Sequence, residues 1–149
     1  MKTRTLSIAL AGVAAAALIG VAANGQTRSA SVATQVSVPA QAENFRLVDN
    51  KAFGHELFYF KDSKAVVLIS HKVGSAHIAA AADSIEKLAA DYAAKGVEVF
   101  LLNSNPADTR EAINADLKAN GLEGLRVLQD DTQLIGESLG VTREAEAFV

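Results

Sequence analysis

Residues 65–78 read AVVLISHKVGSAHI and decide the fold class of this 149-residue chain. Ala65–Ser70 is apolar up to its last residue, which is typical of a strand buried on both faces of a sheet. His71–Ser75 forms a short loop, in which Gly74 permits unusual backbone angles. A long helix is predicted next, over residues 76–95, from apolar residues that recur at three- and four-residue spacing. The predicted inner face of this helix consists of Ile78, Ala82, Ile85, Ala89 and Tyr92.

Strands and helices alternate on both sides of this segment. Upstream, residues 45–49 and 55–60 are predicted to form a β-hairpin around a turn at 50–54. Downstream, the pattern predicts a strand at 97–102, a helix from Asn105–Pro106, a strand at 125–128, a helix at 133–139 and a last strand at 145–149. This order predicts one α/β domain over residues 44–149, with helices on both faces of a sheet.

The first 23 residues are typical of a secretory signal peptide. Lys2 and Arg4 form a basic start, and an apolar run follows from Leu6 to Ala23, the expected cleavage point. A membrane anchor is the less favoured alternative, because the run is rich in alanine and borderline in length. Residues 24–43 lack periodicity and are predicted to be a flexible linker. We therefore expect a periplasmic or secreted protein with no stable membrane anchor after cleavage.

Charge and cysteine content exclude further classes. Loss of Lys2 and Arg4 with the leader would take the formal net charge from −3 to −5. A mildly acidic protein without a cluster of Lys and Arg has little attraction for nucleic acid, so no such partner is expected. The chain contains no cysteine. Disulfides and lipid attachment at cysteine are therefore unavailable, and stability must come from packing.

Four stretches of the chain resemble the thioredoxin-like superfamily, in its redoxin branch with the peroxiredoxins and thiol-specific antioxidant proteins. FRLVDNKAFGHELFYF, at 45–60, is similar to the opening hairpin of that branch, and AVVLISHKVGSAHI is similar to its active-site strand and loop. YAAKGVEVFLLNSNPADT resembles its second strand and Asn-rich turn. LQDDTQLIGESLGVTREAEAFV resembles the segment where Thr-Pro commonly precedes the last strands. The resemblance implies a thioredoxin-like fold over residues 45–149 and relationship to oxidoreductases.

The residues that carry catalysis in that branch are replaced in this chain. By the resemblance, Ser75 stands at the reactive cysteine and Lys72 at the first cysteine of a Cys-x-x-Cys pair. Ala145 stands at the cis-proline, and Glu144 replaces the Thr before it. A cis bond before Ala costs about 2.5–4 kcal/mol, so a trans bond is expected. Thiol–disulfide exchange needs a thiolate, whereas the Ser75 hydroxyl stays protonated at neutral pH, so we expect no catalytic residue.

Three groups of residues suggest sites that need no thiol. His71 and His77 flank the loop and suggest a copper or zinc site, but no third ligand stands nearby, and exposed loop histidines are the simpler interpretation. Gly74 and Ser75 at a helix N-terminus, with the charge of Lys72, suggest an anion site. Ser75 with either histidine suggests a nucleophile and base, but no orienting acid is evident, and a helix cap is the simpler role.

Two acidic pairs receive structural interpretations. Asp130 and Asp131 precede a predicted helix, and are expected to form a turn and a helix cap. Glu144 and Glu146 are expected on the exposed edge of the last strand.

The favoured functional hypothesis is an exported redoxin-like domain that acts as a non-catalytic binding or accessory module of a redox system. The alternative is a metal-binding protein that uses His71 and His77. No cofactor is expected. A thioredoxin-like sheet normally continues past the strand predicted at 145–149, so the C-terminal strand and helix are expected to be missing. A protein partner or a further domain is then expected to complete the sheet.

Overall fold

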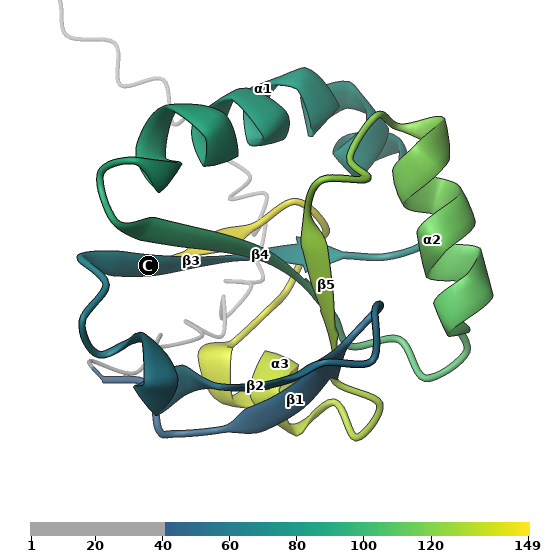
Figure 1. The fold of residues 1–149 in the computed structure, drawn as a ribbon. Coiled ribbons are helices and arrows are strands. Elements are labelled where there is room, and N and C mark those ends of the chain that lie inside the picture. The colour runs from purple at the N-terminus through teal and green to yellow at the C-terminus, as the bar shows by residue number, and fades with distance from the viewer. Residues whose placement is uncertain (1–40) are drawn as a thin grey trace, which may run out of the picture. The chain divides into compact units, whose positions relative to one another are not determined.

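A mixed six-stranded sheet forms the centre of the domain (Figure 1). The computed structural model describes residues 41–149, so the predicted leader and most of the predicted linker lie outside the described residues. The strands are β1 (Arg46–Asp49), β2 (Gly54–Glu56), β3 (Ala65–His71), β4 (Val97–Asn103), β5 (Arg126–Gln129) and β6 (Ala147–Phe148). Their order across the sheet is β2-β1-β5-β4-β3-β6. β3, β4 and β5 are parallel, whereas β1 and β6 are antiparallel to their neighbours.

Helices cover both faces of this sheet, which confirms the predicted α/β class (Figure 1). α1 (Ala76–Ala93) and α2 (Arg110–Ala119) pack on one face, and α3 (Leu134–Leu139) packs on the other. Alternate strand residues point to opposite faces. Val67 and Ile69 of β3 therefore join the core under α1 and α2, while Leu68 joins the core near α3. None of the described helices is long and apolar enough to cross a membrane.

Helix α1 begins directly after Ser75, as the sequence indicates, but it ends at Ala93, two residues before the predicted end at residue 95. The Ser75 hydroxyl caps it by accepting the Ile78 N–H at 3.2 Å, which confirms the predicted cap. Ile78, Ala82 and Ile85 are buried against the sheet. Gly96, just past the end, has φ +80°, a backbone angle that favours glycine. The predicted inner face is too long by one residue, because Tyr92 is 42% exposed.

The predicted hairpin forms, but its second strand is shorter than expected. β1 pairs with β2 in antiparallel register, and Leu47 lies opposite His55. Asp49 fixes the turn by accepting the N–H groups of Lys51 and Phe53 at 2.8 and 2.9 Å. The chain leaves the sheet after Glu56 and forms a 3-10 helix, Leu57–Phe60, instead of the strand predicted to residue 60.

The predicted start of helix α2 at Asn105–Pro106 is wrong. Thr109 caps the helix by accepting the Ala112 N–H at 3.2 Å. Asn105 uses its side chain in a local turn instead, where its carbonyl accepts the Ala107 N–H at 3.3 Å. Asp108 is likewise engaged elsewhere, in the loop after β3. The helix therefore begins at Arg110, after the turn in which the side chains of Asn105 and Asp108 bind other groups.

The segment before α3 is fixed by Asp130, which is fully buried. Its carboxylate accepts the N–H groups of Ile135 and Gly136 at 3.1 and 2.9 Å, which confirms the predicted turn. The predicted helix cap is wrong, because the residue before the helix is Gln133 and neither Asp130 nor Asp131 occupies the N-cap position. The Ser104 hydroxyl also donates to it at 2.8 Å. Gly136 lies so close that a Cβ there would meet Ser104 Oγ at 2.6 Å.

We expect Gly136→Ala to destabilise the domain by about 1–3 kcal/mol, because the added methyl overpacks this contact. Urea unfolding followed by circular dichroism measures the loss. Gly124→Ala is the matched control, since a Cβ at Gly124 meets nothing within 4 Å among the described residues. An equal effect of both substitutions would contradict the packing explanation.

Candidate functional site

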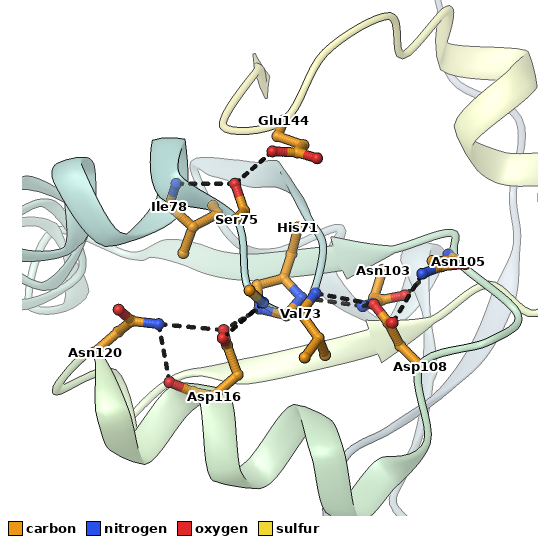
Figure 2. A network of polar contacts seen from close by, with 11 residues as sticks. His71, Val73, Ser75, Ile78, Asn103, Asn105, Asp108, Asp116, Asn120 and Glu144 are labelled. Carbon is orange, nitrogen blue, oxygen red and sulfur yellow. Dashed lines mark hydrogen bonds and ion pairs between the residues drawn. The ribbon is translucent and has the colours of Figure 1, made fainter.

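Two carboxylates hold the loop that joins β3 to α1. The Val73 N–H donates to Asp108 Oδ2 at 2.9 Å, and the Gly74 N–H donates to Asp116 Oδ1 at 2.9 Å (Figure 2). The Ser75 N–H donates to the Lys72 carbonyl at 3.2 Å. The N–H groups predicted to receive an external anion at Gly74 and Ser75 thus already bind acceptors of the chain. An anion there would have to displace Asp116.

His71, predicted to be an exposed loop residue, is buried in a network of polar side chains at the end of β3. It is 4% exposed, and both ring nitrogens have partners. Asn103 Nδ2 lies 3.1 Å from His71 Nδ1, and Asp116 Oδ2 lies 3.1 Å from His71 Nε2 (Figure 2). The Asn103 carbonyl oxygen accepts the Asn105 N–H at 2.9 Å and its amide nitrogen donates to Asp108, so the amide orientation is fixed.

This orientation decides the tautomer of His71. Because Asn103 donates, Nδ1 must accept and carries no proton, and Nε2 donates its proton to Asp116. The ring is therefore neutral. Burial lowers the pKa of His71 below its ordinary value of 6.5, although the nearby carboxylates of Asp116, Asp108 and Glu144 act in the opposite direction.

The two predicted metal ligands line the same cleft at the end of β3, but they differ in burial. His77 is exposed on the first turn of α1, whereas both nitrogens of His71 are already hydrogen-bonded. Within residues 41–149, no group of three His, Asp or Glu side chains is arranged to hold a metal ion. Metal binding through His71 and His77 stays an untested prediction, and it would require one of the His71 contacts to break.

The Ser75 hydroxyl joins the loop to the segment before β6. It donates to Glu144 Oε2 at 2.6 Å while it accepts the Ile78 N–H (Figure 2). The prediction that Glu144 and Glu146 lie on an exposed strand edge is therefore wrong for both. Glu146 accepts the Thr142 and Arg143 N–H groups at 3.0 and 3.3 Å. The Thr142 N–H in particular lowers the pKa of Glu146.

Ser70 holds this same segment against β3. Its hydroxyl donates to the Arg143 carbonyl at 2.6 Å and accepts the Glu146 N–H at 2.9 Å. Its carbonyl accepts the Ala145 N–H at 2.8 Å, and its own N–H donates to the Glu146 carbonyl at 2.9 Å. These bonds fix Ala145 at φ +58°, a left-handed angle that costs a non-glycine residue about 1–2 kcal/mol.

The left-handed angle also corrects the predicted last strand. β6 begins at Ala147 and not at Ala145, because Ala145 has the wrong backbone angles for a strand. The peptide bond before Ala145 is trans as expected, since no cis bond occurs in residues 41–149.

A cleft of about 800 Å³ opens beside the loop, at the end of β3. Three basic side chains, Lys72, His77 and Arg143, line it together with Glu144 and Glu146. Arg143 Nη2 lies 3.8 Å from Glu146 Oε1 in a loose ion pair. Among the described residues, no carboxylate lies within ion-pair distance of Lys72 or His77. The cleft therefore contains both basic and acidic side chains, and Lys72 has no ion-pair partner among the described residues.

The structure brings some predicted residues together and adds others. Lys72, His77 and Ala145 all line one cleft, as does Ser70, which the sequence did not suggest. Asn103 was also missed, although it ends β4 directly beside His71, and carboxyl ends of parallel strands meet at one sheet edge. The sequence offered no acid that could orient His71, and in the structure Asp116 of α2 has this role. No local signal marked it, because its contacts lie far away in the chain.

Neither models of known protein families nor curated proteins match this sequence. Solved structures do match. A hypothetical protein from Sinorhizobium meliloti is 29% identical with a TM-score of 0.61, and the match covers 70% of this chain and 59% of that one. A secreted disulfide oxidoreductase from Mycobacterium tuberculosis, homologous to DsbE, is 16% identical with a TM-score of 0.56, covering 65% and 68%. Peroxidoxin BcpB from the same organism is 15% identical with a TM-score of 0.59, covering 71% and 67%.

These matches establish the fold. The domain has a thioredoxin-like fold, as these solved structures do, and the chain contains no cysteine. The chain spans 59% of the length of the Sinorhizobium protein.

We expect Ser70→Ala to destabilise the domain by about 1–3 kcal/mol, because it leaves the Arg143 carbonyl and the Glu146 N–H without a partner. Urea unfolding measures the loss, and hydrogen exchange is expected to accelerate at Glu146. The control is Ser84→Ala on the exposed side of α1, where no such loss is expected. Unchanged exchange at Glu146 would show that Ser70 does not hold this segment.

The lowered pKa of His71 predicts a pH-dependent stability. In the unfolded chain the His71 ring takes up a proton near pH 6.5, whereas burial opposes its protonation in the folded protein. The stability that comes from the neutral ring is therefore complete above about pH 6.5 and decreases as the pH falls below it. The slope contributed by one such proton is at most about 1.4 kcal/mol per pH unit. Urea unfolding at about pH 7.5 and about pH 5.5 measures it.

His71→Gln is expected to remove that contribution, and His77→Gln, which replaces an exposed ring, is expected to retain it. The third histidine, His55, is present in all three proteins, so its contribution cancels in the comparison. If His71→Gln kept the full pH dependence, the titrating group would have to be another residue.

Proposed function

We propose that this protein is an exported, cysteine-free redoxin-like domain that binds a partner in a redox system and does not carry out thiol chemistry itself. The observation that carries the proposal is the position of the Ser75 hydroxyl, which lies between the Ile78 N–H and the Glu144 carboxylate. Ionising Ser75 would place two negative oxygens 2.6 Å apart, so a reactive alkoxide is strongly disfavoured there.

Export is supported by the first 23 residues, whose basic start and apolar run are typical of a secretory signal peptide. The similarity in fold to a secreted disulfide oxidoreductase is consistent with the same compartment. A periplasmic or secreted location is therefore part of the proposal.

The cleft beside Ser70 and Lys72 is the proposed binding surface, and an acidic segment of a partner is the proposed ligand. Glu144 and Glu146 already accept hydrogen bonds from the chain, whereas Lys72 and His77 have no ion-pair partner among the described residues. Lys72 brings a full positive charge, and His77 adds charge when it is protonated. An incoming carboxylate would compensate these groups.

The free side of β6 is the proposed second contact. Within the described residues β6 pairs only with β3, so its outer backbone groups can pair with another strand. An apolar groove of about 430 Å³ lies beside it, lined by Phe45, Leu57, Leu68 and Phe148 among others. A strand from a partner protein or from a further domain would extend the sheet there and cover the groove.

A thiol-peroxidase and disulfide-reduction assay with an external reductant tests the non-catalytic part of the proposal. We expect no turnover above the protein-free rate, because sulfur exchange needs a thiolate. Turnover that Ser75→Ala abolishes would overturn it. A Ser75→Cys variant serves as the positive comparison, since it restores a thiol at a helix N-terminus.

Titration with an acidic peptide of Glu and Ser, followed by amide chemical shifts, tests the proposed ligand. A matched peptide with Gln in place of Glu is expected to bind more weakly. We expect Lys72→Gln to weaken the acidic peptide about three- to tenfold at low salt, and salt to reduce this difference. Lys87→Gln, which removes an exposed charge that is paired with Asp91, is the control. Equal effects of the two substitutions would place the peptide elsewhere.

A further inference from the structure

Asn120 and Gly121 form an Asn-Gly pair at the end of α2. In such a pair the backbone nitrogen of glycine can attack the side-chain carbonyl carbon of asparagine. The new N–Cγ bond closes a succinimide ring, the Cγ–Nδ2 bond breaks, and ammonia leaves. Water then opens the ring to aspartate or isoaspartate. Glycine favours the reaction because it places no side chain beside the attacking nitrogen.

Gly121 is exposed, and its surroundings are open. A Cβ built on Gly121 meets nothing within 4 Å among the described residues. The Gly121 N–H donates to the Lys118 carbonyl at 3.4 Å, a long hydrogen bond that holds the attacking nitrogen only weakly. Gly121 also has φ +71° immediately after the last helical turn, where helix ends open most readily.

The side chain of Asn120 holds Asp116, whose carboxylate binds the loop between β3 and α1. Its amide nitrogen donates to the Asp116 carbonyl at 2.9 Å and to Asp116 Oδ2 at 3.2 Å (Figure 2). The same Oδ2 accepts the proton of His71 Nε2, and Oδ1 accepts the Gly74 N–H. Asn120 therefore helps to orient the carboxylate that joins α2 to the loop.

We propose that Asn120 is a deamidation site and that its conversion releases the His71–Ser75 loop from α2. Conversion removes both amide donations and leaves a second carboxylate within contact distance of Asp116. Like charges so close repel each other. Asp116 must then turn away from Asn120, and its bonds to His71 and Gly74 weaken. The loop that lines the cleft loosens as the protein ages.

Peptide mapping by mass spectrometry after incubation of the native full chain at mildly alkaline pH tests the chemical step. We expect Asp and isoaspartate to accumulate at Asn120 faster than at Asn50, Asn103 or Asn114, none of which precedes glycine. Gly121→Ala should slow the conversion. If Asn120 stayed intact in the folded protein while it converted in urea, the fold would block the reaction and the proposal would fail.

Hydrogen exchange of the Gly74 N–H tests the release of the loop. We expect Asn120→Asp to accelerate this exchange about tenfold, whereas Ala119→Asp, which adds the same charge at an exposed neighbouring position, leaves it unchanged. Unchanged exchange in Asn120→Asp would overturn the proposal. Should that variant fail to fold, the Gly74 N–H exchange is compared between fractions of the partly converted native protein that are separated by charge. Peptide mapping then assigns each fraction to conversion at Asn120 or at Asn24, the other asparagine that precedes a glycine.

Discussion

The carboxylate of Asp116 is the interaction on which the candidate site depends. It accepts hydrogen bonds from the His71 ring, the Gly74 N–H and the Asn120 amide. It therefore links the end of β3, the following loop and the end of α2. Polar groups buried beside an apolar core need partners, or they cost free energy. Within residues 41–149 no buried side-chain nitrogen or oxygen lacks one. The loop conformation follows from this requirement, because few other arrangements satisfy all these groups together.

Hydrogen bonds hold the two segments in which the resemblance places the reactive cysteine and the cis-proline of redoxins. Ser75 stands where the resemblance places the reactive cysteine, and its contact with Glu144 ties the loop to the segment before β6. Ala145 stands where the resemblance places the cis-proline, and Ser70 holds it in a left-handed conformation with a trans bond. Both segments are therefore held by groups that do not undergo exchange chemistry. A fixed loop beside a cleft supports the proposal of a binding role.

The neutral state of His71 has the same origin. Asn103 cannot reverse its amide, because its oxygen already accepts the Asn105 N–H, so it can only donate to the ring. A proton on Nδ1 would then face a donor. Three carboxylates nearby favour the charged ring, but the geometry and the burial oppose it. His71 thus acts as a structural residue that joins Asn103 to Asp116, and the positive charges that line the cleft are those of Lys72 and Arg143, beside the carboxylates of Glu144 and Glu146.

The sequence alone was enough to predict the α/β class, the buried strand at Ala65–Ser70 and the cap at Ser75, and it shows that the chain contains no thiol. Periodicity, glycine positions and residue type report these features directly, because each depends on neighbours within one or two turns. The sequence placed the start of α2 at Asn105 and the last strand at Ala145, and both were wrong. Local preferences of Asn and Ala were overridden there by side chains from distant segments, which need their own partners.

Only the tertiary structure decided the environment of His71, the partner of Ser75 and the cleft itself. Asp116 lies far from His71 in sequence, and nothing near it marks it as a ligand of the loop. Glu144 reaches Ser75 only because Ser70 bends the chain before β6. Such contacts depend on how strands and helices pack, and a linear pattern contains no record of which distant side chains meet. The sequence therefore shows directly that the site contains no cysteine, whereas the arrangement of its side chains depends on the fold.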